Sequence, residues 1–201
     1  GNSAAVNVDN VIYNVMAAFY TACSTFMGQN WGAGKKDRMM KSYYISLGYS
    51  FVIAAVLGVA FAFLTPPLVG PDEYPHLAKC YRQSSTLLGQ PVADDDDILL
   101  VRSCDAPYFK NHTGDIGIYA YKEMLEHLGD AGCSGETTVS SDTYVTADPI
   151  NNTLYLGQIA GITLARMMGL GFHGMLLLGR LCNLALYLSL IHISEPTRPI
   201  S

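Results

Sequence analysis

The sequence predicts a mainly α-helical integral membrane protein, with about three to four transmembrane helices and a large acidic extracytoplasmic loop. The first observation is a run of thirty residues, Ser42–Pro71, that contains no Asp, Glu, Lys, Arg or His. Its central part, Ile45–Leu64, has the roughly 20 residues that cross the core of a bilayer. The second is an acidic middle: residues 72–148 hold fourteen of the seventeen acidic residues and five of the twelve basic ones, a net charge of −9. The third is a further apolar stretch, Leu154–Ile191.

The charges at the two ends of the apolar run predict its orientation. Four basic residues precede it and an acidic pair follows it: Lys35, Lys36, Arg38 and Lys41, then Asp72 and Glu73. Basic residues stay on the cytoplasmic side. We therefore expect a multi-pass protein of the bacterial plasma membrane, with the bilayer as a partner and the acidic middle outside. A strongly negative segment argues against nucleic acid as a partner.

The first two elements expected are membrane helices. Residues Ala4–Met27 form an apolar stretch with helical spacing, interrupted by polar residues that are expected to face protein or a water-filled cavity. Gly28–Gly34 should break this helix, and Lys35–Lys41 should form the cytoplasmic turn. The second helix then covers Ser42–Leu64 and ends at the Thr65-Pro66-Pro67 sequence, because proline cannot donate a backbone hydrogen bond.

The acidic middle is expected to begin with an amphipathic helix, from Asp72 to about Leu88, lying along the membrane surface. Residues Gly89–Thr153 are expected to be mostly loop, with one helix over Ala120–Leu128 and a short strand over Thr137–Thr146. Three cysteines occur in this middle: Cys80, Cys104 and Cys133. One disulfide, Cys104 with Cys133, is an option, but three thiols leave one over and the pairing stays open.

The last apolar stretch fits two helices, Leu154–Met168 and Gly174–Ile191. The first is short for a full crossing, so it either re-enters the membrane or begins in the headgroup layer. Gly157 and Gly161 provide a face of small residues that lets a neighbouring backbone approach closely.

The residues VNVDNVIYNVMAAFYTACSTFMGQNWGAGKKDRMMKS, from Val6 to Ser42, closely resemble the multidrug and toxic compound extrusion (MATE) transporters. The resemblance covers roughly residues 1–58. It implies antiport of organic cations coupled to Na⁺ or H⁺, through a cavity between two six-helix lobes. Asn7, Asp9 and Asn14 would then line a substrate-binding cavity; the alternative is that they are polar groups in helix packing.

The segment PPLVGPDEYPHLAKCYRQSSTLLGQ, from Pro66 to Gln90, indicates different chemistry. Asp72 and His76 are four apart and share a helix face. Lys79 and Arg82 lie on adjoining faces. A carboxylate can act as a base and basic side chains can neutralise phosphate, as sugar transfer from a lipid-phosphate donor requires. The alternative is a helix start with acids that compensate the dipole and a basic rim at the membrane.

The same segment, with NNTLYLGQIAGITLARMMGL and LLLGRLCNLALYLSLI, resembles the membrane family called domain of unknown function 2142. Coverage is roughly residues 60–191. That family is similar to the GT-C glycosyltransferases, so by resemblance Asp72 would be the base and Glu73 a second acid or a contact to a divalent metal. Arg166 and Arg180 would meet a lipid pyrophosphate or snorkel to the headgroups.

The end of the chain, LSLIHISEPTRPIS, resembles translated sequencing-adapter read-through, and we treat the tail as non-native. Two unrelated resemblances that meet in one apolar run predict a chimeric reading frame, inactive as it stands, with its seam between Gly48 and Pro67. The expected parts are a MATE-like helix pair (1–58), the seam and the end of a membrane helix (59–70), the extracytoplasmic loop (71–153), the C-terminal membrane helices (154–191) and the tail (192–201).

Overall fold

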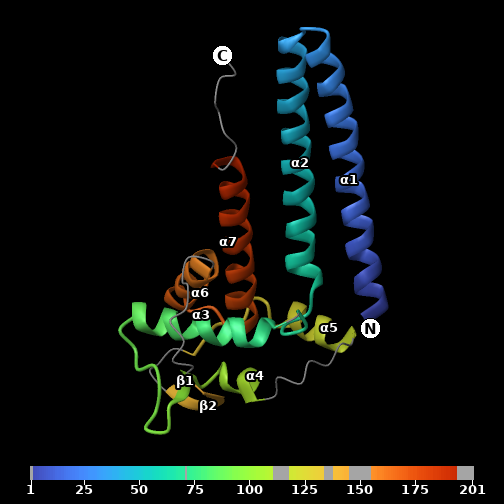
Figure 1. Ribbon diagram of the computed structural model, residues 1–201. Helices are drawn as coiled ribbons and strands as arrows, with labels where there is room; N and C mark the ends of the chain where they lie inside the picture. Colours follow the sequence, from blue (N-terminus) through green and yellow to red (C-terminus); the bar gives the residue numbers. More distant parts are fainter. Residues whose placement is uncertain (1, 71, 111–117, 134–137, 145–154, 194–201) are drawn as a thin grey trace. The chain divides into compact units, whose positions relative to one another are not determined.

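The computed structural model describes residues 2–70, 72–110, 118–133, 138–144 and 155–193 (Figure 1). In the first helix, side chains are described for residue 14 and from residue 17 onward. In the rest of the described chain they are described everywhere except at residues 118–120, 144 and 190–193. The chain divides into two compact units, residues 1–57 and 58–201, and each is described by itself. Of the expected tail, residues 192–201, the first two belong to the last helix and the other eight lie outside the described residues.

The first unit is built from two long helices joined by a tight turn (Figure 1). Helix α1 is Asn2–Gly32, and α2 begins at Lys36 and continues to Leu64. The turn depends on Gly34, whose φ of +70° is a conformation that glycine adopts without steric cost. Around it the Lys35 N–H bonds to the Asn30 carbonyl (2.8 Å) and the Gly34 N–H to the Trp31 carbonyl (3.0 Å), the two bonds of a Schellman cap.

This turn corrects one boundary. The helix does not break at Gly28, because the chain continues in helical conformation to Gly32, and most of the basic residues lie in the first turns of α2 rather than in the connection. Glycine inside a long helix costs only about 1 kcal/mol, so Gly28 is not by itself enough to end it.

Helix α2 is 29 residues long, and within the described part of the chain it is the one helix long and apolar enough to cross a membrane. Only 6% of its most apolar window is buried. A soluble core helix would be mostly buried, so this exposure favours lipid as the surroundings. The total of three to four crossings stays a prediction.

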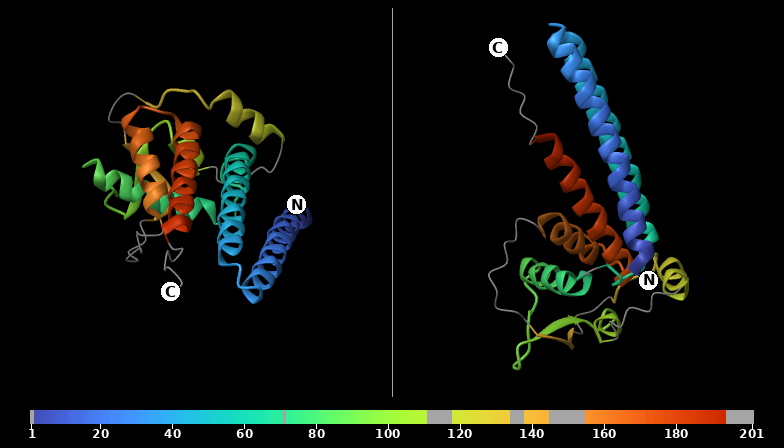
Figure 2. Two further views of the ribbon diagram at one scale, coloured as in Figure 1. Left: turned by 90° about the horizontal axis from the view of Figure 1, so that it is seen from above. Right: turned by 45° about the vertical axis from the view of Figure 1, so that its right-hand side comes forward.

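The second unit contains the end of α2 and the remaining elements (Figure 2). In chain order they are α3 (Glu73–Leu87), β1 (Ile98–Arg102), α4 (Ala106–Lys110), α5 (Ile118–Glu126), β2 (Thr138–Tyr144), α6 (Leu156–Met167) and α7 (Phe172–Ile193). Strands β1 and β2 pair antiparallel, with Leu100 opposite Ser140 and Val101 opposite Val139. Helix α3 lies crosswise to α7 in both figures.

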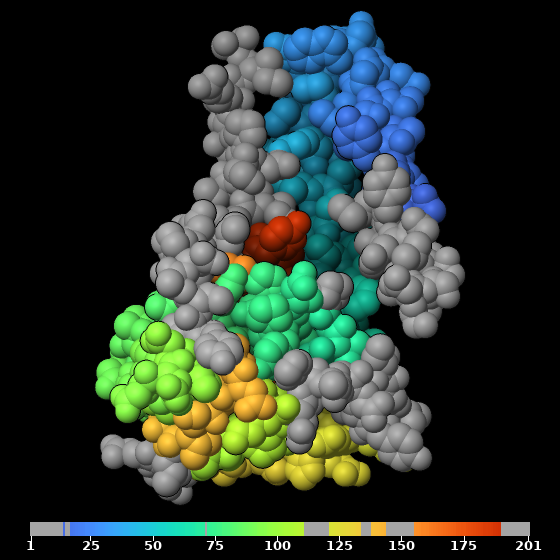
Figure 3. Space-filling model, turned by 60° about the horizontal axis from the view of Figure 1, so that its bottom comes forward, coloured from blue at the N-terminus to red at the C-terminus, as the bar shows by residue number. Residues whose placement is uncertain are grey.

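The expected helices α3, α5, α6 and α7 and the strand β2 are confirmed within a few residues, whereas β1 and α4 were not expected. The described middle of the chain is therefore a folded layer rather than mostly loop. In the space-filling view the surfaces of α3 and β1 (green) and of β2 (orange) lie against one another (Figure 3).

A single hydrophobic core holds this layer to the C-terminal helices. Leu77 and Tyr81 of α3, Phe109 of α4, Ile162 of α6 and Met175 of α7 are each fully buried within it. The apolar face of α3 is thus covered by protein. Amphipathic spacing reports which face of a helix is covered and not what covers it; that α3 lies along the membrane surface stays a prediction.

Helices α6 and α7 form an antiparallel hairpin whose contact depends on glycine, as expected. A Cβ on Gly157 would lie 2.7 Å from the Asn183 Cα, and one on Gly161 would lie 2.6 Å from the Leu178 carbonyl oxygen. Any larger residue would push the two backbones apart.

Candidate functional site at the C-terminal end of helix α2

The candidate site begins where α2 ends and the chain turns into α3. The sequence Thr65-Pro66-Pro67 ends the helix. Two non-glycine residues in this turn have positive φ: Leu68 (61°) and Asp72 (55°). Such backbone angles are uncommon outside glycine and persist where the surroundings enforce them.

Arg180 of α7 fixes this turn. Its Nη1 donates to the carbonyl oxygens of Ala62 (3.2 Å) and Thr65 (2.7 Å), and its Nη2 donates to that of Pro66 (3.1 Å). Its Nε and Nη2 also contact Oε1 of Glu73, at 2.8 and 2.6 Å. A guanidinium has five N–H donors, and these five contacts engage them all. Arg180 therefore ties α2 to α3 and has no donor left for a lipid pyrophosphate.

The two neighbouring acids have different surroundings. Glu73 is mostly buried and paired with Arg180, and its Oε2 accepts the Gly70 N–H at 3.4 Å. Asp72 is exposed, and its side chain makes no cap hydrogen bond to α3. Its carboxylate has no bonded partner among the described residues. Of the expected pair, Asp72 is the acid that a substrate can reach, while Glu73 is engaged in structure.

His76 does not bind the Asp72 side chain. The bond between these residues is the backbone one, from the His76 N–H to the Asp72 carbonyl (3.2 Å). The His76 ring bonds through Nδ1 to the Tyr155 hydroxyl (2.8 Å) at the start of α6, and the two rings lie 5.3 Å apart. Tyr155 had no signal in the sequence, because the chain separation of 79 residues hides the contact. Lys79 and Arg82 are partly exposed on α3.

Arg166 is directed into the protein. Its Nη1 donates to the hydroxyls of Ser84 and Ser85 (3.0 Å each), its Nη2 donates to the Gln90 side chain, and its guanidinium lies 4.1 Å from the centre of the Tyr81 ring. The residue is 8% exposed, and its Nε has no hydrogen-bond partner among the described residues. This position does not bring Arg166 to a lipid headgroup.

A second buried network stands beside it, and the sequence analysis missed it. Arg102 donates from Nε (2.7 Å) and Nη2 (3.1 Å) to the carboxylate of Asp105, which is fully buried. The Tyr81 hydroxyl donates to the same carboxylate (2.9 Å) and accepts the Arg102 backbone N–H (2.9 Å). Burial next to this carboxylate raises the pKa of Tyr81. Arg102 and Asp105 are three residues apart, a spacing that allows an ion pair. In a segment expected to be a solvated loop, that spacing did not single the pair out.

The fold decides which cysteines of the middle segment are paired. Cys104 and Cys133 form a disulfide, with their Cα atoms 5.7 Å apart. Cys80 is a buried thiol of α3, and burial raises its pKa to about 12. The structure therefore selects one of the pairings left open, and the remaining thiol is an unreactive core residue.

A shallow pocket of about 230 Å³ adjoins Arg180 and Glu73. Its apolar wall comes from the last turns of α2, through Gly58, Phe61 and Ala62. Among the described residues no group of three or more His, Cys, Asp or Glu side chains could hold a metal ion. Glu73 is paired with Arg180 at this turn, and a contact from it to a divalent metal stays a prediction.

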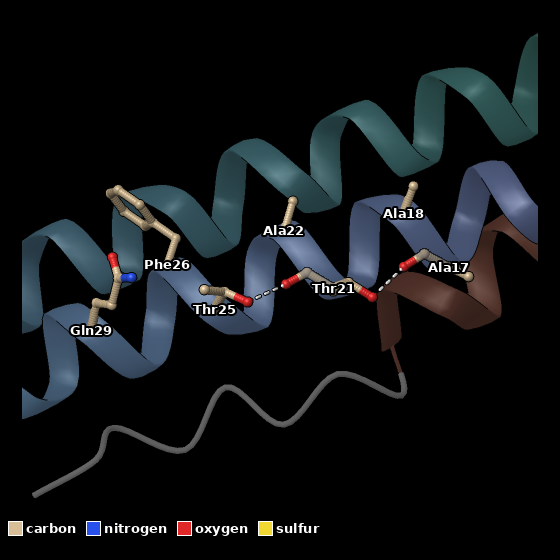
Figure 4. Close-up of a pocket in the computed structure, with 7 residues that line it drawn as sticks. All are labelled: Ala17, Ala18, Thr21, Ala22, Thr25, Phe26 and Gln29. Carbon is tan, nitrogen blue, oxygen red and sulfur yellow. Dashed lines mark hydrogen bonds between the residues drawn. The ribbon is translucent and has the colours of Figure 1, made fainter.

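The residues expected to line a transporter cavity lie on α1. Asn7 and Asp9 are in the helix, but their side chains lie outside the described residues; Asn14 is exposed. A groove of about 650 Å³ follows one face of the same helix, with every lining residue on α1 (Figure 4). Within it Thr21 and Thr25 donate to the carbonyls of Ala17 and Thr21, at 2.8 Å each. These hydroxyls are satisfied by their own helix, as apolar surroundings require.

Helix α2 is long and has exposed apolar side chains, and the threonine hydroxyls of α1 are satisfied within that helix. These features are those of a helical membrane protein. The chain belongs to the family described as predicted membrane protein (DUF2142), whose model matches residues 55–195. The MatE family model matches residues 1–78, so the N-terminal part of the chain is similar to MATE-type transporters. Both resemblances drawn from the sequence are confirmed. The comparisons with curated proteins and with solved structures found no match.

Proposed function

We propose that the chain joins two membrane modules, an N-terminal helix pair derived from a cation-coupled multidrug antiporter and a C-terminal module of the DUF2142 family, and that the joined chain transports nothing. The observation that carries this proposal is the overlap of the two family matches at residues 55–78, which runs from the last turns of α2 through the following turn into α3. Apolar helices of the two families must have the same length to cross a bilayer. A junction between the two sequences at Gly48–Pro67, in α2 or just after it, would therefore still leave a helix that can cross.

The absence of transport follows from the kind of groove that α1 offers. An organic cation needs a path enclosed by several helices, and the groove on α1 is lined by that helix alone. The adapter-like tail, residues 192–201, would be a by-product of the same joined frame.

Long single-molecule reads of the source DNA across codons 40–75 test the fusion directly. We expect reads to diverge into two unrelated sequences within codons 48–67. Uninterrupted reads through this interval, in independent samples, would contradict it.

Transport is tested with purified protein in liposomes that carry a Na⁺ or H⁺ gradient and a fluorescent organic cation. We expect efflux no faster than from empty liposomes. Efflux that depends on the gradient and is abolished by Asp9→Asn would overturn the proposal and assign transport to the MATE-derived part.

A second candidate is sugar transfer from a lipid-phosphate donor of the GT-C type, favoured by the exposed, unpaired Asp72 carboxylate at the end of a membrane helix. Asp72 would take the proton of an acceptor hydroxyl as that oxygen bonds to the sugar carbon, while the lipid phosphate leaves with the electrons of the broken C–O bond. Lys79 and Arg82 would neutralise the phosphate.

This chemistry requires residues 72 onward to lie outside the cytoplasm. The basic start of α2 supports that orientation, and so does the Cys104–Cys133 disulfide, since such bonds persist in oxidising compartments.

Transfer is measured with a radiolabelled polyprenyl-phosphate sugar and the protein in liposomes. If this candidate is correct, Asp72→Asn lowers the rate by roughly 10²–10⁴-fold, the usual contribution of a general base, and the exposed control Asp95→Asn leaves it unchanged. No transfer by the unaltered chain would contradict the candidate.

A further inference from the structure

We propose that α6 is a half-membrane helix, embedded in the half of the bilayer that contains the C-terminal end of α2, with its exposed face in contact with lipid acyl chains. The residues of this face, called here the lipid face, are Leu156, Ala160, Leu164, Met167 and Met168. The proposal uses the membrane location of the family and does not depend on the fusion, on transport or on sugar transfer.

The composition of the lipid face is the first argument. Every exposed side chain along α6 is apolar, including Leu156 (51% exposed), Leu164 (46%) and Met167 (71%). Thr163, at the edge of this face, donates its hydroxyl to the Ile159 carbonyl at 2.7 Å, so it presents no unsatisfied donor. A helix on the surface of a water-soluble domain places charged and polar residues on its outer side. Helix α6 does not.

The opposite face strengthens this argument. The one charged residue of α6, Arg166, points inward to α3, where Ser84 and Ser85 accept its hydrogen bonds at 3.0 Å. Gly157 and Gly161 pack directly on the backbone of α7. The helix thus places its charge inside protein and its methionines outside, which is the arrangement favoured when the surroundings are hydrocarbon.

Contacts along α7 give the depth of α6 relative to the end of α2. A Cβ on Gly58 of α2 would lie 2.5 Å from Leu184 of α7, and Arg180, one turn earlier, bonds to Ala62 and Thr65. Leu184 of α7 is therefore level with Gly58 of α2. Gly58 lies six residues before the last residue of α2, Leu64, which is about 9 Å along the helix axis at 1.5 Å per residue.

Helix α6 meets α7 at the same depth. Gly157 packs against Asn183, the neighbour of Leu184, and Gly161 packs against Leu178. The first turn of α6 consequently lies at the level of Gly58 in α2, with the Tyr155 side chain extending to His76 of α3. The last turn of α6 contacts the other end of α3 through Arg166. Twelve residues reach about 18 Å, against roughly 30 Å for the hydrocarbon core. The helix can enter the bilayer but cannot cross it.

Single tryptophans report this directly, because the chain has one natural tryptophan, Trp31. In a Trp31→Phe background, tryptophan is placed at Leu156 or at Met167. The proteins are reconstituted in phosphatidylcholine brominated either near the carbonyl or near the middle of the acyl chain. We expect loss of fluorescence at both positions, with mid-chain bromine acting more strongly on Leu156→Trp and shallow bromine on Met167→Trp.

Two further variants serve as controls. Val56→Trp, at an exposed position of α2, should be quenched by mid-chain bromine and reports that the chain is inserted. Leu125→Trp, at an exposed position of α5, should be quenched by aqueous acrylamide and not by bromine.

Three outcomes would overturn the proposal. If Leu156→Trp is quenched by acrylamide and not by bromine, the face is in water. If neither quencher acts on it, protein covers the face, either a second copy or another part of a longer chain. If Val56→Trp escapes bromine, the chain does not insert at all. None of these results bears on whether the two modules were fused or whether either is active.

Discussion

The two units of the chain satisfy their polar groups in different ways. In α1, Thr21, Thr25 and Asn30 donate to carbonyls of the same helix, four residues back. In residues 58–201, Arg166 and Arg180 bond to groups more than seventy residues away. The helix pair therefore needs length and apolarity, whereas the second unit needs a particular tertiary arrangement. Substitutions that remove a long-range partner should be costly in the second unit, and comparable changes in the first should not.

The largest effect is expected for Asp105→Ala. It leaves the Arg102 guanidinium buried without its carboxylate, and breaking a buried pair in this way costs about 3–5 kcal/mol. Denaturant unfolding in detergent micelles, followed by a probe in the second unit, measures the loss. Asp95→Ala, at an exposed carboxylate, should change stability by less than about 0.5 kcal/mol. A loss below about 1 kcal/mol for Asp105→Ala would mean that the network does not hold this unit together.

Removal of the Cys104–Cys133 disulfide should rank next. The bond closes a loop with a sequence separation of 29, and the chain-entropy model gives about 3–4 kcal/mol for a loop of this size. Thermal unfolding with and without reductant measures the effect. The same reductant should do nothing to a Cys104→Ala/Cys133→Ala variant, and an equal shift there would show that the bond is not its target.

Gly161→Ala compared with Gly48→Ala contrasts the two units most directly. The new methyl at position 161 would lie 2.6 Å from the Leu178 carbonyl oxygen, while at position 48 it meets nothing within 4 Å. We expect the first change to destabilise by about 1–3 kcal/mol and the second to be neutral or stabilising by up to about 1 kcal/mol. Denaturant unfolding of both variants in the same detergent measures the two changes in stability. Equal effects would remove the distinction.

The smallest effect concerns the exposed pair of His127 and Asp130, whose side chains are 2.7 Å apart. The hydrogen bond to Asp130 raises the pKa of His127 above its ordinary 6.5. Its contribution to stability is therefore complete below pH 6.5 and is lost as the pH rises through the raised value. Asp130→Asn should lower the pKa of His127 in an NMR titration. An unchanged titration would show that the pair does not form in solution.

The membrane character and most element positions could be predicted from the sequence because they depend on local properties. The uncharged run of α2, the amphipathic spacing of α3 and the glycines of α6 each lie within one segment. The two family resemblances were likewise carried by continuous strings. Strand β1 was missed, since a short apolar run inside an acidic segment resembles a loop.

The candidate site could be predicted only in part. Asp72 and Glu73 are adjacent and equivalent in the sequence, and Arg180 distinguishes them by pairing with Glu73 alone. Arg166 and Arg180 are of a residue type that binds phosphate, but their N–H groups donate to other groups of the protein. Spacing gives the face on which a side chain stands, and it does not give the partner that arrives from another element.

By itself, the sequence predicted a membrane-crossing helix, the side on which each of its charged ends lies and the two families that the chain resembles, because each follows from a contiguous stretch. The tertiary structure alone decided which acid stays exposed, which arginines are enclosed and which cysteines are joined. Those outcomes depend on contacts between residues 29 to more than a hundred positions apart in the chain, and a linear pattern does not encode which distant segments meet.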